Sequence, residues 1–378
     1  MNCEKIVLSG FRNIESAEVV FDSGVNILCG DNGQGKTNLM EAIYLASVGR
    51  SFRGADESEM INFGSEGASV NIDFCDSIRC QNISMRMYRG RRRQVELNKV
   101  NVRRLSDMVG ELSTVLFCPG HLSIIQDGPA MRRNYLDVAI SQLRPAYIAS
   151  LQRYAQILKN RNKLIKDAEE DRKTFDATID FWSAQLAEEA ATITVMRAEY
   201  IRRVKGYVSE FFRDMTDGRE VPDILYSSSG ARSMNDKTIP VDDGFCFDRD
   251  AVRRKYLALL NNNHEREIGS GSTLWGVHKD DMVVYLNSHE ARTYASQGQQ
   301  RSLALALKLT EGEICREERS EYPIFLFDDV LSELDAGRRA YLTEQLKDRQ
   351  VIMTCCEKLE LTGAKMISVE GGRYVVTN

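Results

Sequence analysis

Short runs of alternating apolar and polar residues fill the first 118 positions, a pattern that predicts β-strands. "VNIDFC" (70–75) and "NISMRMY" (82–88) predict a pair of strands, which "VELN" (95–98) continues. The apolar run in "GVNILCG" (24–30) predicts a short buried strand. Apolar residues at helical spacing in "KTNLMEAIYLAS" (36–47) predict a helix soon after that strand.

The pattern becomes helical after residue 129. No proline lies between Pro145 and Pro222, and apolar side chains recur every three or four residues from Phe175 to Phe211. This spacing predicts one long helix, preceded by another through Tyr147–Ile165. Two antiparallel helices of about 25 and 40 residues would form an arm up to roughly 60 Å long. A compact helical bundle is the alternative interpretation.

Strand and helix patterns return from Trp275, after a Gly/Ser/Asp-rich stretch at 213–273 that predicts no clear element. We therefore expect an α/β head that is interrupted by a helical insertion. The predicted boundaries are 1–128 for the first part of the head, 129–270 for the insertion and 271–378 for the second part.

Composition indicates an ordinary globular chain, because 43% of its 378 residues are hydrophobic and 28% are charged. No run of about 18 apolar residues and no secretion signal occur, so we expect a cytoplasmic protein outside the membrane. The nine cysteines form no C-x-x-C pair, which predicts free thiols rather than disulfides or a zinc site. The net charge of −5 restricts any nucleic-acid contact to a local basic patch.

The segment "GDNGQGKT" (30–37) has the spelling of a phosphate-binding loop. Glycines let successive backbone N–H groups turn inward, where they surround phosphate oxygens. Lys36 would reach the β- and γ-phosphates, and the Thr37 hydroxyl would bind Mg²⁺. Because the loop lies between a predicted strand and a predicted helix, the sequence predicts a nucleotide site here.

A second set of residues follows the apolar run Ile324–Phe327, which ends in Asp328 and Asp329. In ATPases with a phosphate-binding loop, the first acid at such a strand end holds Mg²⁺ and the second polarises the attacking water. The segment "YASQGQQRSLALALKLTEGE" (294–313) places a serine and a glycine before a predicted helix at 302–311. This arrangement fits either an anion-binding helix start or a simple helix cap.

In combination, these residues resemble the RecF family, bacterial DNA-repair ATPases with an ABC-type head related to the SMC heads. The resemblance covers essentially the whole chain and rests on six motifs: "FRNI" (11–14), "VGRSFR" (48–53), "GPAMRRNYLD" (128–137), "GVHKDDM" (276–282), "ASQGQQRSLALALKL" (295–309) and "DDVLSELD" (328–335). Two features depart from the family pattern. Gly120 and His121 replace two acids, and "VIMTCCEK" (351–358) has no histidine where ABC transporters place their switch residue.

The resemblance assigns roles to individual residues. The nucleotide loop would comprise Gly30, Asp31, Asn32, Gly33, Gln34, Gly35, Lys36 and Thr37. Arg12 and Asn13 would also contact the nucleotide, Thr37 and Asp328 would bind Mg²⁺, and Asp329 would be the hydrolytic carboxylate. Ser296, Gly298 and Gln299 would bind the γ-phosphate of ATP on a second subunit, and Asp335 would line the same interface.

The resemblance also implies a function: ATP-dependent binding of double-stranded DNA, at single-strand gaps or junctions, in recombinational repair, the SOS response and replication-fork maintenance. ATP with Mg²⁺ would close a homodimer on DNA, and slow, DNA-stimulated hydrolysis would release it. The implied protein partners are RecR and RecO, which help to load recombinase. A small-molecule kinase and an ABC transport subunit are the alternative interpretations.

Basic residues supply candidate DNA contacts, since phosphates are bound by clustered arginines. "RMYRGRRRQ" (86–94) and "MRRNY" (131–135) supply six candidates: Arg89, Arg91, Arg92, Arg93, Arg132 and Arg133. A solvated hairpin tip is the alternative interpretation of the first segment. His278 and Lys279 are interpreted as hydrogen-bonding groups of the core or of an interface.

Overall fold

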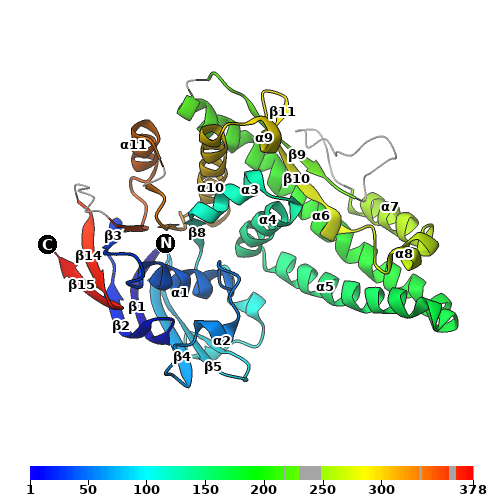
Figure 1. Ribbon diagram of the computed structural model, residues 1–378, viewed down its shortest axis with the longest axis horizontal. Coiled ribbons are helices and arrows are strands. Elements are labelled where there is room, and N and C mark those ends of the chain that lie inside the picture. The colour runs from blue at the N-terminus through cyan, green and yellow to red at the C-terminus, as the bar shows by residue number, and fades with distance from the viewer. Residues whose placement is uncertain (217, 230–247, 332–333, 357–362, 378) are drawn as a thin grey trace. The chain divides into compact units, whose positions relative to one another are not determined.

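The computed structural model describes residues 1–216, 218–229, 248–331, 334–356 and 363–377 (Figure 1). The chain forms two compact units. The first unit combines Met1–His121 with Leu307–Asn378, and the second is Leu122–Ala306. None of the helices in these described ranges is both long enough and apolar enough to cross a membrane.

The first unit contains an antiparallel six-stranded sheet made from residues 2–101. Its strands lie in the order β2 (Ile14–Val20), β1 (Asn2–Phe11), β4 (Gly67–Cys75), β5 (Cys80–Tyr88), β6 (Gln94–Leu97) and β7 (Val100–Asn101). Buried and exposed side chains alternate along β4 and β5, so one face packs inward and the other is open to solvent. The strand pair predicted from the alternating pattern is therefore confirmed.

A second six-stranded sheet in the same unit is mainly parallel. Its order is β15 (Arg373–Thr377), β14 (Lys365–Glu370), β3 (Val25–Cys29), β13 (Val351–Cys355), β12 (Ile324–Phe327) and β8 (Thr114–Phe117). The strands β8, β12 and β13 are buried along their whole length, which explains their continuous apolar sequences. Helix α1 (Lys36–Val48) contacts strands of both sheets and is therefore buried on most of its surface.

The second unit combines helices with a small antiparallel sheet, β11 (His289–Glu290), β10 (Asp281–Leu286) and β9 (Pro222–Ser227). Helices α5 (Pro145–Lys166) and α6 (Arg172–Thr216) lie side by side, as the periodicity predicted (Figure 1). Helix α6 also packs against α7 (Arg249–Asn261) and β9, so the insertion is more than a pair of arm helices.

The other α-helices in the described residues of both units are α2 (Glu57–Met60), α3 (Ser123–Gln126), α4 (Pro129–Leu143), α8 (His264–Ser270), α9 (Ala291–Tyr294), α10 (Gln297–Arg319) and α11 (Ala336–Gln345). Short 3₁₀ turns cover Leu105–Asp107, Pro119–Leu122, Asp167–Glu169 and Val277–Lys279.

The second domain boundary differs from the predicted one. The compact units divide at residues 306 and 307, whereas the sequence placed the boundary at 270 and 271. The reason is that β10 pairs with β9 of the helical unit, and a strand pattern does not reveal which sheet a strand joins. In that unit His278 is a half-buried hydrogen-bonding group: its Nδ1 lies 2.6 Å from the Tyr154 hydroxyl, and burial lowers its pKa to about 4.

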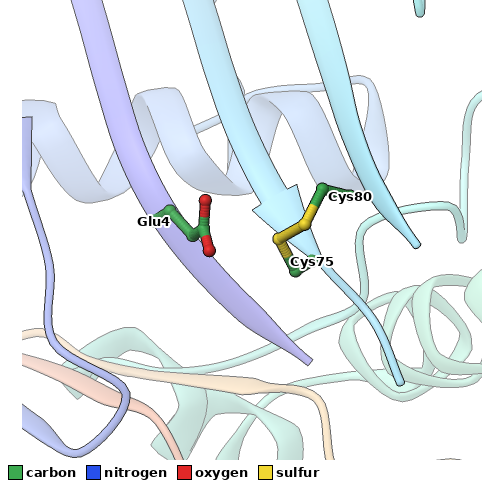
Figure 2. Close-up of side chains that lie close together, drawn as sticks. All are labelled: Glu4, Cys75 and Cys80. Atoms are coloured by element: carbon green, nitrogen blue, oxygen red, sulfur yellow. A yellow bond between two sulfur atoms is a disulfide. The ribbon is translucent and has the colours of Figure 1, made fainter. Parts of the chain in front are cut away.

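The prediction that the cysteines are free thiols is wrong for one pair. Cys75 and Cys80 form a disulfide between β4 and β5 (Figure 2). A separation of five residues gave no hint that the intervening turn would place the two side chains opposite each other. The other cysteines in the described residues form no disulfide: Cys3, Cys29, Cys118, Cys315, Cys355 and Cys356.

Candidate nucleotide-binding site

The predicted phosphate-binding loop connects β3 to α1. Two of its glycines are required by the backbone. Gly35 has a φ of 116°, which side-chain-bearing residues rarely adopt. A Cβ atom on Gly30 would lie 2.2 Å from the carbonyl oxygen of Val369 on β14, so only glycine fits.

Lys36 begins helix α1, and its side chain turns back over the loop. Its Nζ donates to the carbonyl oxygens of Gly30, at 2.5 Å, and of Asp31, at 2.9 Å. The side chain is largely buried, with a relative exposure of 7% for the residue. The position of the ammonium group is therefore set by the backbone of the loop.

Thr37 and the two acids at the end of β12 meet in space although 291 residues separate Thr37 from Asp328. The Thr37 hydroxyl donates to Asp328 Oδ1 at 2.8 Å, and the Thr354 hydroxyl donates to the same oxygen at 3.0 Å. The backbone N–H of Asp329 donates to Thr354 Oγ1 at 2.9 Å. Asp329 has a φ of 53°, a conformation that is uncommon for a residue with a side chain.

These groups line one hollow within the first unit. Its lining residues are Asn32, Gly33, Gln34, Gly35, Lys36, Thr37, Asn38, Arg53, Asp328, Asp329, Thr354 and Cys356. Sequence reasoning had not given Asn38, Arg53, Thr354 or Cys356 a role in the site. Arg53 belongs to the "VGRSFR" motif, which was a usable signal. Thr354 and Cys356 could be found only by knowing that β13 lies beside β12.

The two predicted N-terminal nucleotide contacts differ from each other. Asn13 touches the loop, because its Nδ2 donates to the Gly33 carbonyl at 3.0 Å. Arg12 instead forms a bidentate pair with Glu41 of α1, at 2.9 and 2.7 Å. The guanidinium of Arg12 thus holds the helix that follows the loop.

The C-terminal hairpin of β14 and β15 supports the loop from the other side. The backbone N–H groups of Gly371 and Gly372 donate to the side-chain and backbone oxygens of Gln34, at 2.6 and 2.9 Å. The Tyr374 hydroxyl donates to the Gly35 carbonyl at 3.0 Å, and burial raises the pKa of Tyr374. Asn13 and the β14–β15 hairpin therefore hold the backbone of the phosphate-binding loop from two sides.

His121 lies in the 3₁₀ turn that follows β8, the strand beside β12. Its Nδ1 accepts a hydrogen bond from the backbone N–H of Cys118 at 3.3 Å. Burial, with a smaller effect of Lys308, holds its pKa well below the ordinary value, so the imidazole is neutral at pH 7. Burial and the charge of Asp328 raise the pKa of Cys118 to about 11, so that thiol is also uncharged.

The predicted signature residues lie in the second unit at the start of α10. The predicted helix start was wrong, because α10 begins at Gln297 and includes Gly298 and Gln299. Ser296 caps it: Gln299 N donates to Ser296 Oγ at 3.3 Å, and Ser296 N donates to Gln299 Oε1 at 2.6 Å. The Gln299 amide also donates to Glu220. Within one chain, Ser296 is therefore a helix cap.

Asp335 is likewise a helix cap, since its Oδ1 accepts from the backbone N–H of Arg338 at 2.9 Å. This hydrogen bond lowers the pKa of Asp335 against an opposing effect of burial, and the charge of Arg338 lowers it further. Ser332 and Glu333 of the same motif lie outside the described residues.

The candidate DNA-contacting arginines separate into two groups. Arg132 is buried and forms a bidentate pair with Asp281 at 2.7 and 2.9 Å, and Arg133 donates to the Asp280 carbonyl at 2.8 Å. Arg93 pairs with Glu57 at 3.4 Å and donates to the Gly49 carbonyl at 2.8 Å; its burial lowers the pKa of the guanidinium. The burial and ion pair of Arg132 argue most strongly against DNA binding, whereas Arg93 and Arg133 are half-buried. The exposed members are Arg89, Arg91 and Arg92. Arg89 and Arg92 also donate to backbone carbonyl oxygens, at 3.3 and 3.2 Å, but remain open to solvent.

Comparison with known proteins identifies the family. Residues 2–370 match the family model described as "RecF/RecN/SMC N terminal domain". The "DNA replication and repair protein RecF" of Ruminiclostridium cellulolyticum is 35% identical over 359 residues, which cover 95% of this chain and 93% of that relative. The chain belongs to the RecF family. The RecF protein of Thermoanaerobacter sp. (strain X514) is also 35% identical, over 98% of this chain and 99% of its own length.

Solved structures agree with the RecF assignment. The "recombination mediator protein RecF-ATP in RecFOR pathway" superimposes with a TM-score of 0.89 and 31% identity, over 100% of this chain and 99% of that one. A Pyrococcus furiosus SMC head domain gives a TM-score of 0.54 at 17% identity, over 99% of this chain and 95% of that one, and so shares the fold. The predicted fold class, an ABC-type ATPase head with an inserted helical domain, is confirmed.

Proposed function

We propose that this RecF-family protein is an ATP-dependent DNA-binding protein of replication and recombinational repair. The observation that carries the proposal is the meeting of Lys36, Thr37, Asp328 and Asp329 in one hollow. These are the groups that hold and cleave a nucleoside triphosphate in ATPases with a phosphate-binding loop. The name of a relative's solved structure, RecF-ATP, supports ATP as the nucleotide.

The residues also fit a magnesium ion. The Thr37 hydroxyl and the Asp328 carboxylate put two oxygen atoms within hydrogen-bond distance of each other, and Mg²⁺ prefers oxygen ligands. When bound with ATP, the ion would neutralise phosphate charge. Lys36 binds the terminal phosphates, the inward N–H groups of the loop surround them, and Asp329 orients the water that attacks the γ-phosphate.

A second chain completes each site in this proposal. Ser296 caps helix α10, whose first-turn N–H groups favour an anion, so this helix start suits the γ-phosphate of ATP held by a partner. ATP would close the dimer and slow hydrolysis would open it, with turnover that rises when DNA is bound. The preferred DNA, double strands at gaps or junctions, and the RecO and RecR partners belong to the same proposal.

Mixing two inactive variants tests whether the site is shared. Lys36→Met damages the loop, and Ser296→Asp retains a good helix cap while its charge repels the γ-phosphate. In a mixed dimer one site collects both lesions and the other collects none. With random exchange about half of the dimers are mixed, so roughly a quarter of all sites should be intact and ATP hydrolysis should partly recover.

Light scattering with ATP shows whether mixed dimers form in that experiment, and thermal melting shows whether the Ser296→Asp chain is folded. If mixed dimers form and no hydrolysis recovers, each signature serves its own chain and the shared-site proposal is wrong.

DNA binding is assigned to the exposed arginines near the turn between β5 and β6. Changing both Arg91 and Arg92 to Ala should weaken duplex binding. It should also make the negative slope of log affinity against log salt shallower by about 2, since each phosphate contact contributes about −0.9 to that slope. Fluorescence anisotropy with a labelled duplex and a non-hydrolysable ATP analogue measures this slope. The matched control is Arg79→Ala, an exposed arginine at the opposite end of β5. An unchanged slope in the double variant would mean that this turn is a solvated surface that does not contact DNA.

A further inference from the structure

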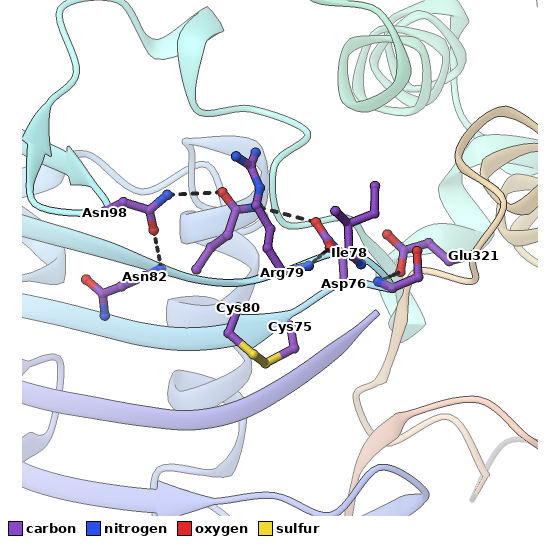
Figure 3. The surroundings of a disulfide bond; sticks show 10 residues. Cys75, Asp76, Ile78, Arg79, Cys80, Asn82, Asn98 and Glu321 are labelled. Atoms are coloured by element: carbon purple, nitrogen blue, oxygen red, sulfur yellow. Dashed lines mark hydrogen bonds between the residues drawn. A yellow bond between two sulfur atoms is a disulfide. The ribbon is translucent and has the colours of Figure 1, made fainter.

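The disulfide lies at the closed end of the β4–β5 hairpin, where the turn itself holds the two cysteines together (Figure 3). The Asp76 N–H donates to the Arg79 carbonyl at 3.0 Å, and Asp76 Oδ1 accepts from the N–H groups of Ile78 and Arg79, both at 2.7 Å. Register along the hairpin continues from Gly67 opposite Tyr88 to Cys75 opposite Cys80. None of these contacts depends on the sulfur–sulfur bond, so reduction leaves two thiols facing each other.

A third ligand comes from the neighbouring strand. The pairing of β1 with β4 shifts register between Cys3 and Lys5, which makes Glu4 the extra residue of a β-bulge. Bulges re-aim side chains, and here the Glu4 carboxylate faces the two sulfurs (Figure 2). A carboxylate oxygen and both Sγ atoms all lie within 4.8 Å of one another. Gln350 fixes the bulge, because its side chain bonds both the N–H and the carbonyl of Cys3, at 2.7 and 2.8 Å.

The donor set suits a borderline-soft divalent cation. Thiolate sulfur and carboxylate oxygen are ligands of Zn²⁺, which takes four tetrahedral ligands and can accept water as the fourth. Two thiolates and one carboxylate carry a charge of −3. The same shallow hollow is lined by Lys5, Lys99 and Asp73, so its two lysines offset only part of the negative charge. Cys80 is exposed and Cys75 is half-buried, so ions and reductants can reach the sulfurs.

We propose that Cys75, Cys80 and Glu4 form a zinc-type cation site in the reduced protein, and that the disulfide is the oxidised form of the same site. A dithiol reductant breaks the Cys75–Cys80 bond by thiol–disulfide exchange. The reductant passes two electrons and two protons to the protein, which gains two thiols, and is itself oxidised to a cyclic disulfide. Binding of Zn²⁺ then displaces the two thiol protons to solvent and forms two zinc–sulfur bonds. A purely stabilising disulfide fits this position less well, since cross-linking gains little where the enclosed loop is short and already closed.

Zinc titration of the full-length chain tests the proposal. The protein is reduced with dithiothreitol, desalted without oxygen and titrated with ZnCl₂ against a chromophoric chelator, and the oxidised chain is treated in parallel. The reduced chain should bind one Zn²⁺ with release of about two protons at pH 7, and the oxidised chain should bind none at this site. Re-reduction should restore binding, which gives a comparison that needs no substitution.

Variants then assign the ligands. Cys80→Ser should abolish the site, and Glu4→Gln should lower zinc affinity by about 10- to 100-fold. Cys356→Ser, which changes an exposed thiol elsewhere, should leave zinc stoichiometry unchanged. Absence of a saturable zinc site in the reduced chain, or equal binding by the reduced and oxidised chains, would overturn the proposal. Since none of these measurements uses ATP or DNA, they are independent of the proposed function.

Discussion

Lys36→Met should raise the dissociation constant for ATP by about 100-fold or more. The ammonium group supplies charge-assisted hydrogen bonds to the phosphates, each contributing roughly 1.5–3 kcal/mol, and methionine supplies none. Methionine retains a long flexible apolar stem, so the packing of α1 should be preserved. Titration with a fluorescent ATP analogue measures the loss, and ATP-dependent DNA binding should disappear with it.

The matched control for this variant is Lys365→Met on β14, which removes a lysine that pairs with Asp22 outside the nucleotide hollow. It should bind ATP as the unmodified chain does. Thermal melting of both variants separates a lost phosphate contact from a lost fold. ATP affinity within a few-fold of the unmodified chain in Lys36→Met would mean that the loop has been assigned wrongly.

Asp329→Asn should reduce ATP hydrolysis by about 10²- to 10⁴-fold while ATP still binds. The substitution removes the negative charge that orients and polarises the attacking water and changes little else. Asparagine is the appropriate replacement because Asp329 has a φ of 53°, and asparagine tolerates this left-handed conformation. Alanine at this position would add backbone strain to the chemical effect.

Single-turnover hydrolysis and light scattering with ATP should show a stable ATP-bound dimer in Asp329→Asn. The contrasting variant is Asp328→Asn, which alters the oxygen that accepts from Thr37 and Thr354 and should therefore weaken Mg²⁺-dependent ATP binding itself. Rapid hydrolysis by Asp329→Asn, or failure to dimerise with ATP, would contradict the role assigned to this carboxylate.

The core of the candidate site was predictable because its signals are local. A glycine-rich loop followed by a helix, and an apolar strand ending in two acids, each define a short structure on their own. Thr354 was not predictable in the same way, because its contact with Asp328 depends on β13 lying beside β12. The pairing of Arg12 with Glu41 was also not predictable, because no local pattern reveals that partner.

Charge runs were the least reliable signal. Arg132 and Arg133 are adjacent in a basic motif, yet one is buried against Asp281 and the other is committed to a backbone carbonyl. A sequence gives the number of charges in a segment but not which of them face solvent. The disulfide was missed for a related reason, since cysteine spacing does not show whether the intervening residues form a tight hairpin.

The order of strands in the parallel sheet has a consequence for synthesis on the ribosome. Strand β8 cannot pair until β12 has been synthesised, about 200 residues later. Strand β3 pairs with β13 and β14, which are synthesised later still. At 5–20 residues per second, the delay for β8 is roughly 10–40 s. The antiparallel sheet needs only residues 2–101, and the second unit is continuous in sequence, so both can fold during this interval. The nascent chain therefore carries two unpaired apolar strands until its last part emerges, and its phosphate-binding loop is the last feature to be completed.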